Sequence, residues 1–487
     1  MATVSGHGER APEANLGLLD ATMIGMGAMI GAGIFVLTGL AAEIAGPAAI
    51  LVFMLNGVVT AFTGLSYAEL AASIPKSGGG YAFVREVFDD LPSFVMGWML
   101  WFAYMIAGGL YALGFAPNFL ELLHVYDLTP APDQVGAVAL PVVDAAVPAA
   151  VGLAFVAVLF LVALNAISTA ASGSVETIFT LIKVSILVVF VAFGATSPMF
   201  TTAEFQPLFA DGAGPLSILP AMGLTFIAFE GYDLITTVTE EVKNPRENIP
   251  KAIFVSLGVT VLVYLAVVGV AVGTLGANGL AEAGEAGIAQ AATTFMPTGL
   301  PIIQNGGAII VFGAVFSTLT ALNAVVIASS RVAFSMGRED QLLPSFGQLH
   351  HRYGTPFVAI LASGVVMLGS VALPTQSAGN MSSLFFLLSF IVVNGSVIKL
   401  RRERPDMTRP YEMPYYPIPP ILGIVLNLIL TGVLVAYLLR TDVLALVLSG
   451  GWILLGVVAY AIYTWLGSSG EAGEAGEPDD AAPQTDD

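Results

Sequence analysis

The sequence contains no cysteine and few charged residues. Without cysteine the chain can form neither a disulfide nor a thiolate metal site. Only 10% of its 487 residues are Asp, Glu, Lys or Arg, whereas a soluble globular domain carries about 25%. Because 56% of the residues are hydrophobic, the chain lacks the polar surface that a soluble protein needs, and we expect an integral membrane protein.

Positive charge is especially scarce. The chain has 16 Lys and Arg residues against 35 Asp and Glu residues, a net charge of −19. Nucleic-acid binding needs a positive surface, so we exclude nucleic acid as a partner. The sequence shows no metal-ligand cluster, no cofactor motif, no nucleophile with an adjacent base and no Walker A sequence. We therefore expect neither a metal, nor a cofactor, nor an enzyme, nor an ATP-driven pump.

Long apolar segments dominate the chain instead. A helix that spans a bilayer needs roughly 20 apolar residues. Twelve such segments occur, at 17–44, 47–71, 93–122, 147–168, 174–195, 215–240, 251–274, 303–331, 356–373, 381–399, 419–439 and 444–466. Their unbroken length predicts helices, since barrel strands alternate in short segments. The prediction is an all-α integral membrane protein with a tail at 1–16, a membrane domain at 17–466 and a disordered acidic tail at 467–487.

The basic residues predict how the chain is oriented. With the N-terminus in the cytoplasm, 14 of the 16 fall on the cytoplasmic side; Arg440 faces outward and Lys183 lies within the fifth segment. This positive-inside pattern predicts a multi-pass protein of the cell membrane with both termini cytoplasmic. The 14 residues are Arg10, Lys76, Arg85, Lys243, Arg246, Lys251, Arg331, Arg338, Arg352, Lys399, Arg401, Arg402, Arg404 and Arg409.

Two of the apolar segments are unusually long and are interrupted by glycine. The first carries "GMGAMIGAGIFVLTG" (25–39), and the sixth carries "FEGYD" (229–233). The glycine spacing of the first approaches a dinucleotide-binding fingerprint, but it lacks the preceding strand and the βαβ unit which that fingerprint requires. Interrupted spans at matching places in two halves indicate a transporter site near the middle of the membrane.

The chemistry of such interruptions indicates the class of ligand. N–H groups around Gly31-Ala32-Gly33, at the start of the outer half of the first segment, suit a carboxylate. Carbonyls freed before Gly231 suit an ammonium group. One pole of each sign predicts a zwitterion such as an amino acid. The alternative is that these glycines only allow close helix packing.

Two ionisable residues within the spans are candidates for function. Lys183 lies about ten residues, or about 15 Å, from the inner end of its segment. It could carry a proton, or its ammonium could stand where sodium binds in other carriers; the alternative is a lysine that reaches the interface. Glu230 could contact a basic substrate side chain, carry a proton, pair with Lys183, or only pack the interruption. Asp233 is expected to cap the helix that follows.

Five segments together resemble the amino acid–polyamine–organocation superfamily, in particular its prokaryotic amino acid permeases related to cationic amino acid transporters. They are "IGAGIF" (30–35), "IPKSGGGYAFVREVF" (74–88), "FIAFEGYDLITTVTEEVKNPRENIPKAI" (226–253), "SSRVAFSMGREDQLLP" (329–344) and "RPYEMPYYPIPP" (409–420). The resemblance covers about 17–466 and implies the leucine-transporter fold. In that fold two inverted five-helix repeats (about 17–195 and 215–400), with helices 1 and 6 broken, precede two peripheral helices (about 418–466).

The same resemblance implies roles for individual residues. The substrate carboxylate would meet N–H groups of Gly31, Ala32 and Gly33. The α-ammonium would meet carbonyls near Ile227 and Glu230. Where many members of the superfamily have an apolar residue, this chain has Glu230, which leaves the preferred amino acid open.

Further implied roles concern closure and coupling. Phe226 or Phe229, beside the break at Gly231, would help to close over the substrate. Lys183 matches a lysine that replaces the sodium site in proton-coupled members. We therefore expect a secondary active amino acid transporter, importing with protons by alternating access. An exchanger of the same fold, or a membrane amino acid sensor that does not transport, is the alternative; the sequence predicts no oligomeric state.

Overall fold

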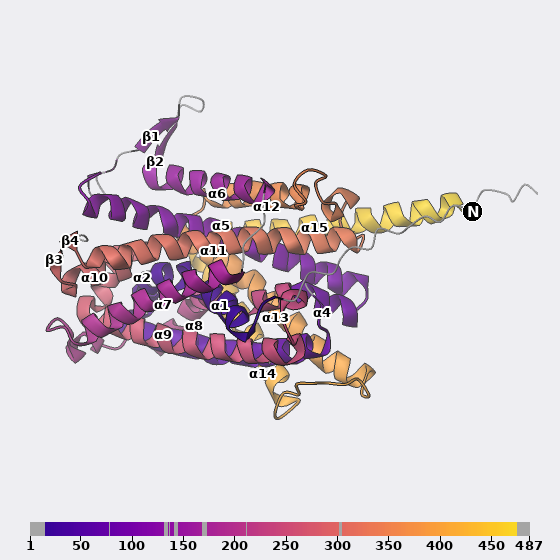
Figure 1. Ribbon diagram of the computed structural model, residues 1–487, viewed down its shortest axis with the longest axis horizontal. Helices are drawn as coiled ribbons and strands as arrows, with labels where there is room; N and C mark the ends of the chain where they lie inside the picture. Colours follow the sequence, from indigo (N-terminus) through magenta and orange to yellow (C-terminus); the bar gives the residue numbers. More distant parts are fainter. Residues whose placement is uncertain are drawn as a thin grey trace, which may run out of the picture.

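The structure is a bundle of long helices (Figure 1). The computed structural model describes residues 15–76, 78–130, 135, 137–140, 145–167, 173–210, 212–300 and 304–474. Arg10 and most of the predicted N-terminal tail lie outside these ranges, as does the C-terminal part of the acidic tail, 475–487. The α-helices are α1 (Leu18–Met29), α2 (Ala32–Ala45), α3 (Ala49–Ser73), α4 (Gly79–Val87), α5 (Asp90–Val125), α6 (Ala149–Ile167), α7 (Gly173–Ala195), α8 (Ile218–Thr225), α9 (Pro245–Ala283), α10 (Gly287–Phe295), α11 (Gly307–Arg338), α12 (Phe357–Ser370), α13 (Thr375–Glu403), α14 (Ile418–Thr441) and α15 (Val443–Glu474).

Short helices and strands connect the long helices. The described chain is helical, as predicted, apart from two short antiparallel strand pairs in loops at one end of the bundle, where loop backbone groups pair with each other (Figure 1). The strands are β1 (Ala137–Leu140) with β2 (Ala145–Pro148), and β3 (Thr298–Leu300) with β4 (Gln304–Asn305). The 3-10 helices are η1 (Gly46–Ala48), η3 (Thr202–Phe205), η4 (Pro215–Ser217), η5 (Phe226–Phe229), η6 (Asp233–Glu241), η7 (Gly284–Ala286) and η8 (Pro344–Gly347).

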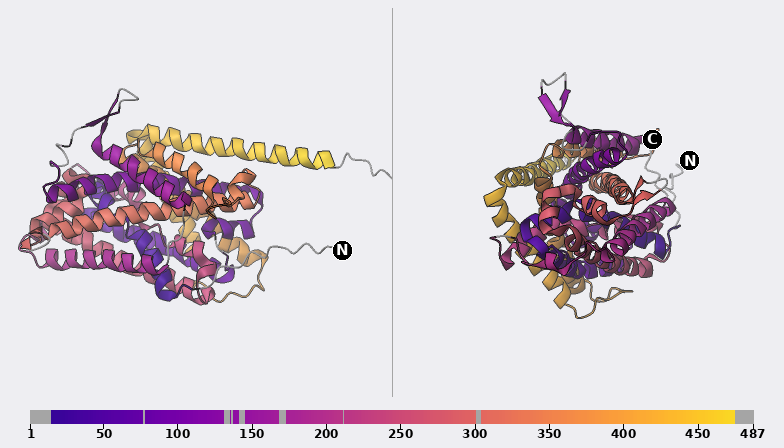
Figure 2. Two further views of the ribbon diagram at one scale, coloured as in Figure 1. Left: turned by 45° about the horizontal axis from the view of Figure 1, so that its top comes forward. Right: turned by 90° about the vertical axis from the view of Figure 1, so that its left-hand side faces the viewer.

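The helices differ greatly in how deeply they are buried. α5 packs along α11 and α13, and α3 packs along α9. The halves α1 and α2 lie against α7, α9 and α11, in the interior of the bundle. In α5 the most apolar window is 94% buried, whereas in α15 it is 17% buried. Thus α5 belongs to the core, while α15 is peripheral and continues beyond the other helices (Figures 1 and 2).

The outward-facing side chains of the peripheral helices are apolar. Seen end-on, the helices form a roughly round bundle from which the β1–β2 pair projects (Figure 2). Large exposed hydrophobic residues occur along α6, α7, α14 and α15, among them Phe155, Phe160, Val188, Leu428 and Leu454. So extensive an apolar surface is not found on soluble proteins and marks contact with lipid. The chain is a multi-pass membrane protein.

The predicted apolar segments all coincide with helices. Within the described residues, ten stretches are long and apolar enough to cross a membrane. The first of them, Leu18–Ser73, contains two predicted segments, and α12 is a shorter apolar helix. Several helices run past the predicted bounds: α9 and α11 extend by up to nine residues at their ends. Those extensions carry polar residues, which end the apolar runs.

Three helical features were not predicted. α4 and α10 are short helices between the long ones. In addition, α15 continues to Glu474, beyond residue 467, where the sequence predicted an irregular tail. Ala and Glu in "GEAGE" are good helix formers, and adding a turn to an existing helix is easier than starting one. α4 packs against η6, and Leu16 pairs with Val242 just after η6. The end of the bundle that they share is called the inner end below, because the positive-inside pattern predicts that it faces the cytoplasm.

Candidate functional site

The first interruption separates α1 from α2. α1 ends at Met29, Ile30 and Gly31 are not helical, and α2 begins at Ala32. A helix that ends inside the bundle leaves carbonyls without intrahelical donors, and these must be satisfied by other parts of the protein. Here Ser317 Oγ of α11 donates to Ile30 O (2.6 Å). The sequence predicted that the N–H groups of Gly31, Ala32 and Gly33 bind a carboxylate. In the structure the N–H of Gly31 donates to Met29 O (2.7 Å). The N–H groups of Ala32 and Gly33, at the start of α2, are left for such a ligand.

Lys183 is directed at this interruption from α7. The side chain is 1% exposed, and its Nζ donates to Gly27 O in the last turn of α1 (2.9 Å). It therefore lies in the interior and contacts the polar end of a helix. The alternative, a lysine whose ammonium reaches the membrane interface, does not fit this buried position. Two further contacts join the same helices: Thr180 Oγ1 donates to Met23 O (3.1 Å) and Thr177 Oγ1 to Asp20 Oδ1 (2.9 Å).

The second interruption lies between α8 and η6. After η5, Glu230 is extended and Gly231 has φ +137°, a conformation that favours glycine. Ile227 O accepts from Glu230 N (3.1 Å). Ser383 of α13 bonds the backbone on both sides of the end of α8. Its Oγ donates to Leu224 O (3.1 Å) and accepts from Ile227 N (3.2 Å).

The two interruptions touch each other. A Cβ atom on Gly33 would lie 2.6 Å from Ala228 Cα, and one on Gly231 would lie 2.6 Å from Met29 N. Tyr264 of α9 lies within hydrogen-bond distance of Met29 O and of Ala228 O (2.9 Å). One hydroxyl thus joins both breaks. The close packing that the sequence left open as a role for these glycines is present, and it brings backbone groups of both breaks together.

Glu230 is buried without a partner. Its side chain is 4% exposed, and neither carboxylate oxygen has a hydrogen-bond partner among the described residues. The suggested pairing with Lys183 is therefore not formed. Asp233 is different, since it accepts hydrogen bonds from Gly231 N (2.9 Å) and from Tyr104 Oη. Asp233 is the first residue of η6, whose N-cap is Tyr232, and Gly231 precedes that helix, so this hydrogen bond is not the cap that the sequence predicted.

A narrow cavity lies beside Glu230. It is bordered by Ala28, by Ala321 of α11 and by Tyr104 and Tyr111 of α5. Its volume of about 10 Å³ is about the space of one water molecule, so an amino acid fits only after the helices move apart. Phe226 and Phe229 do not border this cavity; they pack on Phe390 (6.0 Å between ring centroids) and Tyr264 (5.3 Å), respectively.

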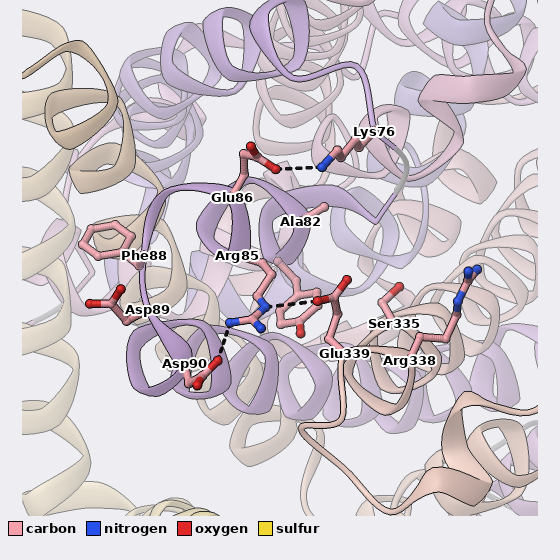
Figure 3. Close-up of a pocket in the computed structure, with 11 residues that line it drawn as sticks. Lys76, Ala82, Arg85, Glu86, Phe88, Asp89, Asp90, Ser335, Arg338 and Glu339 are labelled. Carbon is pink, nitrogen blue, oxygen red and sulfur yellow. Dashed lines mark hydrogen bonds and ion pairs between the residues drawn. The ribbon is translucent and has the colours of Figure 1, made fainter. Parts of the chain in front are cut away.

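A wider cavity of about 640 Å³ lies at the inner end (Figure 3). Arg85 of α4 bonds both Asp90 Oδ1, at the start of α5 (2.5 Å), and Glu339 Oε2, just after α11 (3.2 Å). On the other side Lys76 Nζ contacts Glu86 Oε2 (2.7 Å). The cavity contains none of the residues that the sequence assigned to the substrate.

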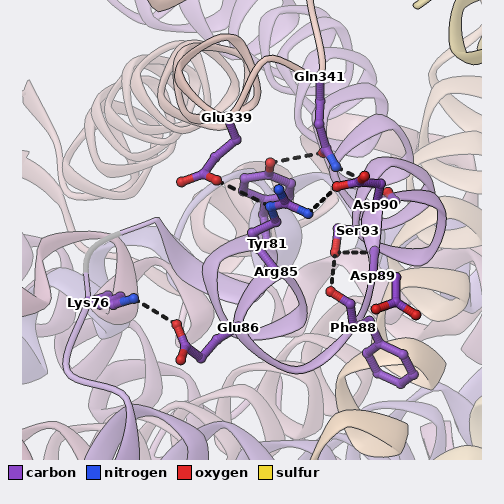
Figure 4. Close-up of polar contacts among 10 residues, drawn as sticks. All are labelled: Lys76, Tyr81, Arg85, Glu86, Phe88, Asp89, Asp90, Ser93, Glu339 and Gln341. Atoms are coloured by element: carbon purple, nitrogen blue, oxygen red, sulfur yellow. Dashed lines mark hydrogen bonds and ion pairs between the residues drawn. The ribbon is translucent and has the colours of Figure 1, made fainter. Parts of the chain in front are cut away.

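Behind Arg85, the buried side chains of Tyr81 and Gln341 form a second polar contact between α4 and the segment that follows α11 (Figure 4). Tyr81 Oη donates to Gln341 Oε1 (2.9 Å), and Gln341 Nε2 donates to Asp90 O (3.1 Å). α4 thereby joins the start of α5 to the end of α11.

The hydroxyl groups that hold the breaks were not predicted. Tyr264, Ser317 and Ser383 are polar residues within mainly apolar segments, which is itself a signal of helix–helix contact. The signal does not say which helix each residue meets, so it could not connect them to the interruptions. Within the described residues no group of three His, Asp or Glu side chains is placed to hold a metal ion.

An apolar surface around a core with buried charged residues defines an integral membrane protein with a candidate site inside its helix bundle. The chain belongs to the amino acid permease family, whose sequence profile matches residues 16–466. It is 30% identical to the branched-chain amino acid permease BcaP of Bacillus subtilis, over 94% of each chain. It is 29% identical to the methylthioribose transporter of that organism, over 92% of this chain and 93% of the relative.

A third relative has a different transport mode in its name. The serine/threonine exchanger SteT of Bacillus subtilis is 26% identical, over 92% of this chain and 95% of the relative. The family and these relatives are transporters. The resemblance to amino acid permeases and the expectation that the chain is not an enzyme are therefore confirmed.

Proposed function

We propose that this protein is a secondary active amino acid transporter of the cell membrane, which imports its substrate together with protons by alternating access. The observation that carries the proposal is the contact between the two interrupted helices, at Gly33–Ala228 and Gly231–Met29. Backbone groups that are not used within helices can bind the two charged ends of an amino acid. Membership of the amino acid permease family supports the same substrate class.

The proposal includes the arrangement of the helices. The interruptions fall in the first and sixth apolar segments, which are matching positions if the first ten segments form two inverted five-helix repeats. α14 and α15 would then be the peripheral pair. Their shallow burial, 28% and 17% of their most apolar windows, is in accord with a place outside the transporting core.

The proposed substrate contacts follow from the two breaks. The carboxylate binds the N–H groups of Ala32 and Gly33 at the positive end of α2, joined by that of Gly31 when its bond to Met29 O opens. The ammonium binds carbonyls near Ile227 and Glu230. Because the cavity beside Glu230 is narrow, these contacts require α1 and η5 to separate, and Phe226 and Phe229 then close over the ligand.

Lys183 is the proposed site of proton coupling. Its Nζ holds Gly27 O at the end of α1. A charged donor makes a stronger hydrogen bond than a neutral one. Loss of the proton would therefore weaken the hold of α7 on α1 and favour its movement. This links a protonation step to the helix that carries the first half of the site.

Uptake into proteoliposomes tests this function. We expect a panel of labelled amino acids to reveal at least one that accumulates under an imposed pH gradient and not under a sodium gradient. Lys183→Ala should lower proton-driven accumulation at least about tenfold, because a buried charge-assisted bond is worth about 1.5–3 kcal/mol. Lys251→Ala, which removes an exposed lysine paired with Glu247, is the control. Sodium-driven uptake, or full proton-driven accumulation by Lys183→Ala, would contradict the assignment of Lys183.

An exchanger is the second candidate, favoured by the similarity to SteT. An exchanger moves labelled amino acid only when unlabelled substrate is present on the opposite side. The same vesicles, loaded or not loaded with unlabelled substrate, distinguish the two modes. Accumulation in unloaded vesicles supports symport, and uptake confined to loaded vesicles supports exchange.

A further inference from the structure

Glu230 differs from the other buried charges near the interruptions. Asp233 accepts two hydrogen bonds, and Lys183 donates one to a carbonyl. Glu230 is equally buried, yet both of its oxygens are without a partner among the described residues. Burying a polar group without a hydrogen bond is costly, and a carboxyl group offers several acceptor sites. This position is therefore suited to a donor that enters from outside the chain.

The walls of the cavity indicate which part of a ligand would enter. Ala28 and Ala321 line it with small side chains, which leave room, and Tyr104 and Tyr111 of α5 line it as well. The lining also includes Gly231 of the second break, whereas neither Gly33 nor Ala228 is part of it. An amino acid held by its carboxylate and ammonium at the two breaks would direct its side chain into this space.

We propose that Glu230 determines side-chain specificity, and that the substrate is an amino acid whose side chain ends in a hydrogen-bond donor. The inference rests on the proposed transport of amino acids. A branched aliphatic side chain would bring only methyl groups to Glu230 and leave its acceptors unpaired. A site built around a hydrogen bond rejects analogues that lack the donor. This chain would therefore differ in substrate from its branched-chain relative.

Paired substrates of nearly equal shape test the inference. Threonine and valine differ by a hydroxyl in place of a methyl group, and lysine and norleucine differ by the terminal ammonium. In proteoliposomes with wild-type protein, we expect the donor-bearing member of at least one pair to be taken up at least about tenfold better. In Glu230→Leu this preference should fall to less than about twofold, because the acceptor is gone.

The variants and controls separate specificity from stability and from proton transfer. Glu43→Leu removes an exposed carboxyl group of α2 and should keep the wild-type preference. Size-exclusion elution shows whether each variant is folded. If Glu230→Leu is not recovered, Glu230→Met replaces it. Methionine also lacks the carboxyl acceptor, so the preference for the donor-bearing member of the selected pair should again fall to less than about twofold.

Each remaining outcome counts against the inference. Equal wild-type uptake within both pairs overturns it while leaving amino acid transport in place. An unchanged preference in the folded Glu230 variant also overturns it, and loss of proton-driven accumulation in that variant would then assign Glu230 to proton transfer. If no amino acid is transported under any gradient or in exchange, the proposed function fails, and the inference fails with it.

Discussion

Glu69 shows how a single buried carboxylate can fix a long loop. It lies near the inner end of α3 and its side chain is 1% exposed. Both oxygens bond Arg401 of α13, at 2.6 and 2.7 Å, and Oε2 also accepts from Met413 N (2.8 Å). Arg409 Nε lies 3.8 Å from Oε1. The motif "RPYEMPYYPIPP" thus contributes both a cation and a backbone donor to Glu69, which ties the 404–417 connection to two helices.

Removing this charge should destabilise the protein. In Glu69→Gln, Arg401 and Arg409 lose the counter-charge that compensates their partial burial. Because breaking a buried pair leaves a charge uncompensated, we expect a loss of about 3 kcal/mol in the free energy of unfolding. Thermal unfolding in detergent measures the change. Glu403→Gln, which removes an exposed partner of Lys399, should cost less than about 0.5 kcal/mol. Equal effects of the two variants would show that the Glu69 network is not stabilising.

Residue identity alone could predict some members of the site and not others. Lys183 and Glu230 stand out in the sequence because charged residues are rare within apolar spans, and the structure finds both buried. Lys183 bonds Gly27 O in the last turn of α1, next to the first break, a partner that the sequence did not predict. Tyr264, Ser317 and Ser383 were missed. Hydroxyl-bearing residues are common in membrane helices, and only the packing of α9, α11 and α13 shows that these three meet the breaks.

At the scale of elements, α4 is a short helix whose partly exposed charged residues, Arg85 and Glu86, form ion pairs with neighbouring segments. Glu86 contacts Lys76 Nζ (2.7 Å) and Arg404 Nη1 (3.1 Å). The hydrogen bond from Lys76 is the main reason why the pKa of the Glu86 carboxyl is below its ordinary value; burial opposes this and Arg404 adds to it. A lowered pKa means that the pairs stabilise the folded state above the unfolded pKa of about 4.3, and that this stability is lost as the pH falls through the folded pKa.

α4 should therefore loosen in acid. After correction for intrinsic exchange rates, we expect hydrogen exchange of the α4 amides to be constant from about pH 7 to pH 5 and to become faster below about pH 4.3. The effect is modest, up to about 1 kcal/mol per pair, because the groups are partly exposed. Glu86→Gln should exchange faster at neutral pH and lose most of the acid effect. An acid effect of wild-type size in that variant would mean that other groups control α4.

Long elements were predictable, and short ones were not. Each of the predicted apolar segments coincides with a helix, because a span of about 20 apolar residues has few alternatives in a bilayer. The positions where helices stop inside the bundle, at Gly31 and Gly231, follow from glycine. α4 begins within "SGGGY" (77–81), a glycine run that favours a loop. The helical conformation of α4 depends on packing against α5 and α13. Those contacts involve residues elsewhere in the chain, so the local sequence does not predict them.

For the whole molecule, charge distribution and packing give different kinds of information. The positive-inside pattern predicts the orientation of every loop from the sequence alone. Packing is not predictable in this way: the contact of Gly33 with Ala228, for example, joins residues nearly 200 positions apart. The width of the cavity beside Glu230 depends on the same packing. The class of the protein could thus be predicted from composition, and its substrate contacts could not.

The proposed orientation can be measured directly because the chain has no cysteine of its own. Thr202, in η3 between α7 and α8, and Ser345, in η8 between α11 and α12, are both exposed. With cytoplasmic termini, the first lies outside the cell and the second inside. A membrane-impermeant maleimide should label Thr202→Cys in intact cells and Ser345→Cys only after permeabilisation. The unsubstituted chain, which should not be labelled, is the control. Labelling of Ser345→Cys alone in intact cells would invert the topology, and with it the direction of transport that the proton gradient is proposed to drive.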